Sequence, residues 1–151
     1  MNPHGLASLD LVQRFLASQV LSIVPNEIRS DLRAAIKILN EASVELNVLY
    51  PTLLEESREL LRLSIELQAT TEIKLSHIEQ EKLSALDNAF KNGFASLTDL
   101  LRFRDELNRL VTSQMALLQA ADHPNNRAWL ERFYGLLGTH ASARLGWQSV
   151  F

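Results

Sequence analysis

The sequence contains no cysteine, few glycines and no long uninterrupted apolar run. The absence of cysteine excludes disulfides, zinc–thiolate sites, iron–sulfur clusters and cysteine nucleophiles, and it fits a reducing compartment. The five glycines include no closely spaced set followed by Lys-Ser or Lys-Thr, which a phosphate-binding loop requires. The net charge of −3 argues against binding to nucleic acid, because such binding neutralises phosphates with clustered Lys and Arg.

The most apolar long segment, residues 6–24, is interrupted by polar side chains such as Asp10, Arg14 and Gln19. A membrane-spanning helix needs about 20 predominantly apolar residues. A secretory leader needs a basic start followed by an unbroken apolar stretch. We interpret the segment as an amphipathic core helix and expect no membrane association and a cytoplasmic location.

The chain does contain helical spacing almost throughout. Its 151 residues, 46% of them hydrophobic, fit one domain with one core. Apolar residues recur three and four positions apart, and no stretch alternates strictly as a half-buried strand would. The sequence therefore predicts an all-α fold, an antiparallel bundle of about five to six helices in a single domain.

Proline, threonine and glycine mark the expected helix boundaries. The first helix is expected to end at Pro25 and the second before Pro51, because the residue preceding a proline favours an extended backbone. Thr52 and Glu55 have the spacing of a capping box, so a new helix is expected there. Residues 52–92 then form one helix or two, with a weak break at Thr70-Thr71.

The second half of the chain shows similar boundary signals. Asn92-Gly93 is typical of a helix C-terminus. The next helix is expected to begin near Ser96 and to stop near Pro124. A short helix is then expected to end at Gly138, with one more within residues 139–151.

Catalytic and metal-binding patterns are sparse. The histidines are scattered, and neither Glu-x-x-His nor His-Glu-x-x-His occurs, so we expect no metal and no cofactor. No Gly-x-Ser-x-Gly elbow occurs either, and we expect no complete catalytic site. A phosphotransfer bundle would present a histidine such as His77 on a helix. Glu79 and Glu81 follow it and would repel phosphate, which favours a surface or half-buried histidine.

A charged stripe lies on the expected second helix. Arg29, Arg33 and Lys37 are spaced four apart and continue into Glu41 and Glu45. Such a stripe could hold a phosphate or a coenzyme A tail. The alternative, which is the commoner outcome, is a solvated face in which Glu41 pairs with Lys37.

Three segments carry a resemblance to a known family. They are FLASQVLSIVP at residues 15–25, RAAIKILN at residues 33–40 followed by Glu45-Leu46, and LLQAADHPN at residues 117–125. Together they resemble a family of small all-helical bacterial proteins of unknown function that accompany aminoglycoside-phosphotransferase-like kinases and acyl-CoA dehydrogenases. The resemblance covers about residues 9–125. We therefore expect residues 1–125 to form the bundle and residues 126–151 to be a C-terminal helical extension packed on the same domain.

The resemblance implies a function without catalysis. A family member is similar to an accessory subunit of the hydroxyacyl-CoA kinase of levulinate breakdown, in which the kinase partner supplies the ATP chemistry. By resemblance, partner or substrate contact is expected at Arg33, Glu45, Asp122 and Pro124, and the charged stripe adds Lys37. The alternative interpretation of the motif positions is a buried arginine–carboxylate tie plus a helix stop.

Aromatic residues give a second indication of a partner surface. Trp129, Phe133 and Tyr134 fall on adjacent helical turns, while Trp147 and Phe151 lie near the end of the sequence. Aromatic residues are enriched at interfaces, but most of those at helical spacing fill a core. Core is favoured for Trp129 and Phe133, and both interpretations stay open for Trp147 and Phe151.

Two alternatives stand beside the accessory subunit. One is a self-associating structural bundle, a homo-oligomer, for which Val44 and Val48 extend the apolar face beside Leu39 and Leu46. The other is a phosphotransfer domain that uses His77.

Overall fold

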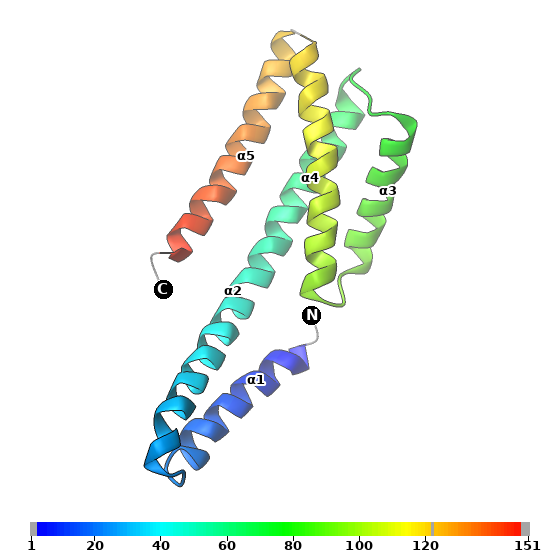
Figure 1. Ribbon diagram of the computed structural model, residues 1–151. Helices are drawn as coiled ribbons and strands as arrows, with labels where there is room; N and C mark the ends of the chain where they lie inside the picture. The colour runs from blue at the N-terminus through cyan, green and yellow to red at the C-terminus, as the bar shows by residue number, and fades with distance from the viewer. Residues whose placement is uncertain (1–2, 122, 149–151) are drawn as a thin grey trace. The chain divides into compact units, whose positions relative to one another are not determined.

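The computed structural model describes residues 3–121 and 123–148, and its secondary structure is entirely helical (Figure 1). The described elements are α1 (Pro3–Phe15), the π-helix η1 (Leu16–Val20), α2 (Asn26–Thr70), α3 (His77–Asn92), α4 (Leu97–Ala120) and α5 (Pro124–Gln148). The predicted all-α class is confirmed. Within the described ranges, none of the helices combines the length and the apolar character that crossing a membrane demands.

The chain divides into two compact units. We call Met1–Leu53 with Ala95–Leu97 the hairpin unit, and Leu54–Phe94 with Thr98–Phe151 the bundle unit. The division cuts α2 after Leu53, whereas the boundary predicted between residues 125 and 126 falls inside α5.

The hairpin unit consists of α1, η1 and the N-terminal part of α2. Gln13 Nε2 donates to Asn40 Oδ1 at 3.2 Å, which ties α1 to α2. In the turn between the helices, Arg29 Nη2 donates to the Val24 carbonyl at 3.1 Å. Among the described side chains of this unit, only Ser43 and Leu53 are buried. Two helices alone offer each other one contact face, so most apolar positions here stay partly exposed.

The predicted helix break before Pro51 is wrong, because α2 continues through this proline. A proline inside a helix removes one donor and crowds the carbonyl one turn earlier. Thr52 Oγ1 donates to the Val48 carbonyl at 2.8 Å, so a side chain adds a hydrogen bond at this turn. The capping box predicted for Thr52 and Glu55 is also wrong, since no helix starts there and Glu55 pairs with Arg58 at 2.5 Å.

The bundle unit places the C-terminal part of α2 among α3, α4 and α5 (Figure 1). Buried residues of α4 follow one another at three- and four-residue steps, which defines a single stripe facing the core. The buried apolar residues of the unit are Leu60, Leu61, Leu63, Leu67, Leu75, Leu83, Leu86, Leu100, Phe103, Leu107, Leu110, Val111, Leu118 and Phe133.

Residues 52–92 form parts of two helices, with the break after Thr70. Ser76 caps α3 through a complete capping box with Glu79, in which each residue binds the other's backbone N–H. Gly93 ends α3 with a φ of 78°, as its position after Asn92 predicts. The weak break expected at Thr70-Thr71 lies where α2 ends, and the capping box places the start of α3 at His77.

The short helix predicted to end at Gly138 is also wrong. A single helix, α5, continues through Gly135 and Gly138 to Gln148. Each helical glycine costs about 1 kcal/mol relative to alanine, which tertiary contacts can override. Phe133 and His140, on either side of Gly138, are both buried in the bundle unit.

Candidate functional site

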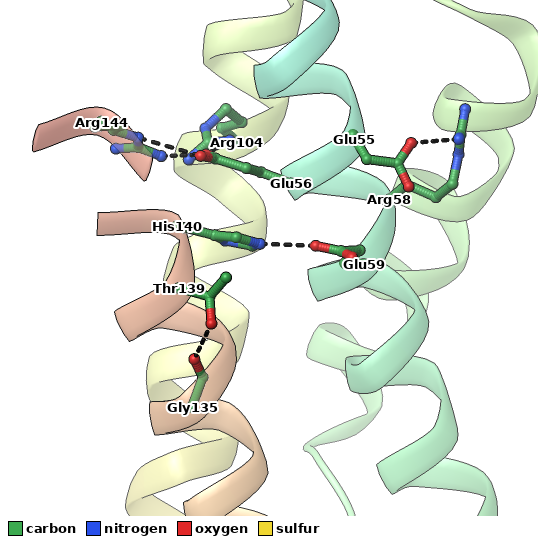
Figure 2. A network of polar contacts seen from close by, with 9 residues as sticks. All are labelled: Glu55, Glu56, Arg58, Glu59, Arg104, Gly135, Thr139, His140 and Arg144. Carbon is green, nitrogen blue, oxygen red and sulfur yellow. Dashed lines mark hydrogen bonds and ion pairs between the residues drawn. The ribbon is translucent and has the colours of Figure 1, made fainter. Parts of the chain in front are cut away.

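The first candidate site is a charged cluster between α2, α4 and α5 of the bundle unit (Figure 2). Glu56 of α2 is 4% exposed. Arg104 Nη1 of α4 lies 2.8 Å from Glu56 Oε2, and Arg144 of α5 donates to both carboxylate oxygens. One buried carboxylate thus joins three helices.

Electrostatics keep this carboxylate charged. Burial alone would raise the pKa of Glu56, but the hydrogen bond from Arg144 and the charges of Arg104 and Arg144 together outweigh it. The pKa of Glu56 therefore lies below its usual value of 4.5. A carboxylate held ionised by two guanidinium groups is poorly suited to exchange protons near neutral pH. The arrangement suits the positioning of helices.

Two further polar contacts join α2 to α5. His140 is 7% exposed, and its Nε2 lies 2.9 Å from Glu59 Oε2 (Figure 2). Arg132 donates two hydrogen bonds to the Glu66 carboxylate, at 3.0 and 2.9 Å. Hydrogen bonding by Arg132 lowers the pKa of Glu66. The carboxylates of Glu56, Glu59 and Glu66 on α2 are therefore each bound by a basic side chain of α5.

A neutral polar pair lies in the core between α2 and α4. Ser64 Oγ donates to Gln114 Oε1 at 2.7 Å, and Gln114 Nε2 donates to the Ser64 carbonyl at 3.0 Å. Both residues have 0% exposure. These two hydrogen bonds give the buried polar groups of Ser64 and Gln114 their partners. They also fix the position of α2 and α4 relative to each other along the helix axes.

Sequence reasoning missed these residues, although a signal was present. Glu56 follows Leu53 by three positions and precedes Leu60 by four, so it lies on an apolar stripe. Gln114 occupies the same kind of position between Leu107 and Leu118. A polar residue on an apolar stripe indicates a buried group that needs a partner.

The second candidate site is the set of exposed apolar side chains of the hairpin unit, on α1, the following turn and α2, which we call the hairpin surface. Its large apolar side chains are each at least 41% exposed. They are Leu11, Val12, Phe15, Ile23, Ile28, Ile38, Val44 and Val48. The larger bundle unit has only four such exposed side chains among its described residues, namely Ile78, Leu101, Leu117 and Tyr134.

The motif positions fall in both units. Arg33 is exposed on α2, which disagrees with a buried arginine tie at this position. Lys37 pairs with Glu41 at 3.7 Å on an exposed face, as the solvated-face interpretation predicts. Glu45 belongs to α2 but its side chain lies outside the described part, and so does Asp122 as a whole. Pro124 is the first residue of α5.

The aromatic residues of α5 have different environments. Phe133 is completely buried, so its interpretation as a core residue is confirmed. Trp129 is half-buried, and the Arg132 guanidinium lies 4.2 Å from its ring centroid. Tyr134 is 54% exposed, and its hydroxyl accepts a hydrogen bond from Gln119 Nε2 at 2.9 Å. The Trp147 side chain and Phe151 lie outside the described residues.

His77 is an exposed surface histidine, as favoured by the sequence. It is the first residue of α3 and not a mid-helix residue, because Ser76 caps the helix immediately before it. Its side chain is 84% exposed, and Nδ1 lies 3.5 Å from Glu81 Oε1.

A cleft of about 790 Å³ opens at one end of the bundle unit. The cleft is lined by residues from the ends of helices and from the connections between them, including Glu66, Thr70, His123 and Trp129. The Glu66 carboxylate in its wall is already bound by Arg132. Across residues 3–121 and 123–148, no cluster of three or more histidine, aspartate or glutamate side chains is arranged to hold a metal ion.

Comparison with protein-family models, with curated proteins and with solved structures gives no match to this chain in any of the three. The resemblance carried by residues 9–125 therefore stays a prediction, and the function has to be argued from the two candidate sites.

Proposed function

We propose that this chain is a non-catalytic interaction subunit and that the hairpin surface binds its partner protein. The observation that carries the proposal is the hairpin surface itself. Single exposed apolar residues are normal, but Leu11, Val12 and Phe15 are neighbours on one side of α1, and adjacent exposed apolar side chains are typical of an interaction site. Leu11, Phe15 and Ile38 are 69%, 55% and 65% exposed, so each has most of its surface free for a partner.

The bundle unit supports a role without catalysis. Its most buried carboxylate, Glu56, is bound by two arginines, and Glu59 and Glu66 are bound by His140 and Arg132. Side chains that stabilise one another in this way hold helices in place. A chain whose buried charges are paired in one unit and whose other unit exposes apolar side chains suits a subunit that binds another protein.

The proposed partner is an aminoglycoside-phosphotransferase-like kinase that acts on hydroxyacyl-CoA, a choice that rests on the resemblance alone. The proposed subunit contributes the hairpin surface, and the kinase contributes ATP binding and phosphoryl transfer. Arg33 and Lys37 lie exposed on the same unit and are the proposed polar contacts at the edge of the interface.

The test is co-purification with such a kinase from the same genome, followed by kinase turnover with and without this chain. A Leu11→Gln/Phe15→Gln/Ile38→Gln variant is expected to weaken association by at least about tenfold, because interface apolar side chains lose desolvation energy when replaced by polar ones. The matched control is Ile78→Gln/Leu117→Gln, which changes exposed apolar residues of the bundle unit. Equal binding by both variants would contradict the proposed surface, and absence of any association would remove the kinase as partner.

A second candidate function is self-association through the same surface. Val44 and Val48 are 41% and 44% exposed, and both lie on one face of α2. Light scattering distinguishes the two functions, because a chain that stays at 17.1 kDa at every concentration cannot be a homo-oligomer.

A further inference from the structure

The cleft at one end of the bundle unit has the size of a small-molecule site and an aromatic wall. It lies where α2 and α4 end and α5 begins. Its volume of about 790 Å³ is within the range of about 300–1,000 Å³ that is typical of ligand pockets. Trp129 of α5 lines the cleft with its indole ring. The residues around this ring therefore decide which kind of molecule the cleft can hold.

One face of the Trp129 ring is covered by the chain itself. The Arg132 guanidinium lies 4.2 Å from the ring centroid, and it donates two hydrogen bonds to the Glu66 carboxylate. Trp129 lines the cleft, whereas Arg132 lines a neighbouring groove between α2 and α5 and does not line the cleft. Arg132 therefore covers the ring face that is turned away from the cleft and leaves the opposite face for a ligand.

An uncharged flat ring suits this free face better than a cation does. The Arg132 guanidinium already places a positive charge on the indole, and a second cation on the opposite face would be repelled by it. A neutral heteroaromatic ring stacks on tryptophan without that repulsion. The geometry of Trp129 and Arg132 thus favours a planar, neutral ligand.

Polar groups of the cleft can bind the edge of such a ring. His123 Nδ1 accepts a hydrogen bond from the Asn125 backbone N–H at 3.2 Å, so the neutral imidazole carries its proton on Nε2 and can donate it. The side chains of Glu72 and Asn125 form no hydrogen bond or ion pair with any other residue that the structure describes. A carboxylate, an amide and an imidazole N–H together offer partners for both the donors and the acceptors of a heterocycle.

The cleft is unfavourable for a phosphate group. Among the described residues that line it are two glutamates, Glu66 and Glu72, but no lysine or arginine. Phosphate sites depend on such bases or on free N–H groups at a helix start. The start of α5 offers no such groups, because the N–H groups of Asn126 and Arg127 both donate to the His123 carbonyl.

We propose that this cleft binds a nucleoside or a free nucleobase. The base stacks on Trp129, and its polar edge lies against Glu72, His123 and Asn125. The two glutamates of the wall exclude nucleotides, because a phosphate would meet like charge with no base to offset it. This inference uses the bundle unit alone, so it does not depend on the hairpin surface or on a kinase partner.

The test uses the fluorescence of Trp129. The chain has two tryptophans, so the full-length Trp147→Phe variant leaves Trp129 as the only one. This variant is titrated with adenosine, guanosine, cytidine and uridine and with the corresponding nucleoside monophosphates. We expect at least one nucleoside to quench the fluorescence saturably, and its monophosphate to bind at least about tenfold more weakly. Absence of saturable quenching by all four nucleosides, or equal affinity for the monophosphate, would overturn the proposal.

The stacking contact is tested by calorimetry with the nucleoside that quenches most strongly. Trp129→Leu should weaken its binding by at least about tenfold, because a stacked aromatic supplies much of the affinity for a base. The matched control is Tyr134→Leu, which removes an exposed aromatic side chain of the same helix that does not line the cleft. The control should bind like wild type, and an equal loss in both variants would contradict a site at Trp129.

The exclusion of phosphate is tested by Glu72→Lys, a change at an exposed position between α2 and α3 that leaves the helices intact. A lysine here would face the phosphate with opposite charge, so the affinity for the monophosphate should rise by at least about tenfold relative to the nucleoside. Circular dichroism checks that the variant stays helical. An unchanged preference for the nucleoside would show that the ligand does not lie beside Glu72 and would overturn the proposed cleft.

Discussion

The helices α1 to α4 are amphipathic in the hairpin unit and in the bundle unit alike, yet their apolar side chains end in different environments. Fourteen of the fifteen buried apolar residues described belong to the bundle unit. Eight of the twelve large exposed ones belong to the hairpin unit. In the bundle unit α2 has three neighbouring helices, whereas in the hairpin unit it has one. An apolar stripe therefore predicts a helix equally well in both, but the number of neighbours decides whether the stripe becomes core or surface.

The largest expected difference comes from truncating one leucine in each unit. Leu100→Ala, at a completely buried position, should lower the free energy of unfolding by about 2–5 kcal/mol. Leu11→Ala, at a position 69% exposed, should change it by no more than about 0.5 kcal/mol. Urea denaturation followed by circular dichroism measures both. A large loss for Leu11→Ala would show that the hairpin unit has a core of its own.

The second largest effect on stability is expected at the charged cluster around Glu56. Glu56→Gln leaves Arg104 without its carboxylate and should destabilise the chain by about 3 kcal/mol at neutral pH. The pKa of Glu56 is lower in the folded protein than the usual 4.5, so its contribution is present above pH 4.5 and is lost as the pH falls from 4.5 through the lowered pKa. The difference in the free energy of unfolding between wild type and Glu56→Gln, measured by urea denaturation, should therefore become smaller as the pH falls below 4.5.

The matched control for this experiment is Glu55→Gln, because Glu55 forms only an exposed pair with Arg58. It should change the free energy of unfolding by no more than about 0.5 kcal/mol. A pH-independent difference for Glu56→Gln would mean that the charge of Glu56 is not what joins the three helices.

The smallest effect concerns a glycine of the bundle unit. Gly138→Ala should stabilise the unit by about 0.5–1 kcal/mol, because the glycine is helical and an added Cβ meets no atom within 4 Å. Gly93→Ala should be destabilising, since its φ of 78° disfavours a side chain. Hydrogen exchange measured along the chain shows which helices become more stable in Gly138→Ala. Slower exchange in α1 as well as in α5 would show that the two units open together, which would weaken the comparison drawn above.

Helical class and several boundaries could be predicted from the sequence because they depend on local chemistry. The Asn92-Gly93 terminus needs only a residue that accepts a positive φ. The errors at Pro51 and Gly138 have the opposite cause. Both residues disfavour a helix interior. The tertiary burial of Leu53 and Glu56 beyond Pro51, and of Phe133 and His140 around Gly138, overrides that preference, and no local pattern contains it.

The candidate sites were predictable to different degrees. Val44 and Val48 were identified as an apolar extension of α2, and their exposure agrees with it. The partners of Glu56 lie 48 and 88 residues away in the chain, at Arg104 and Arg144, so the spacing of the sequence does not indicate them. A buried carboxylate could be inferred from its stripe, but not the two arginines that neutralise it.

The contacts of α2 with α5, which are Glu56–Arg144, Glu59–His140 and Glu66–Arg132, also have a consequence for synthesis of the chain. The paired residues are 66, 81 and 88 positions apart, so the bases are translated long after the acids. At common elongation speeds of about 5–20 residues per second, the delay is roughly 3–18 s. A nascent chain on the ribosome therefore presents these glutamates without their partners for seconds, until its own α5 is complete. Translation speed, more than the strength of the completed bundle, sets how long these glutamates stay without their partners.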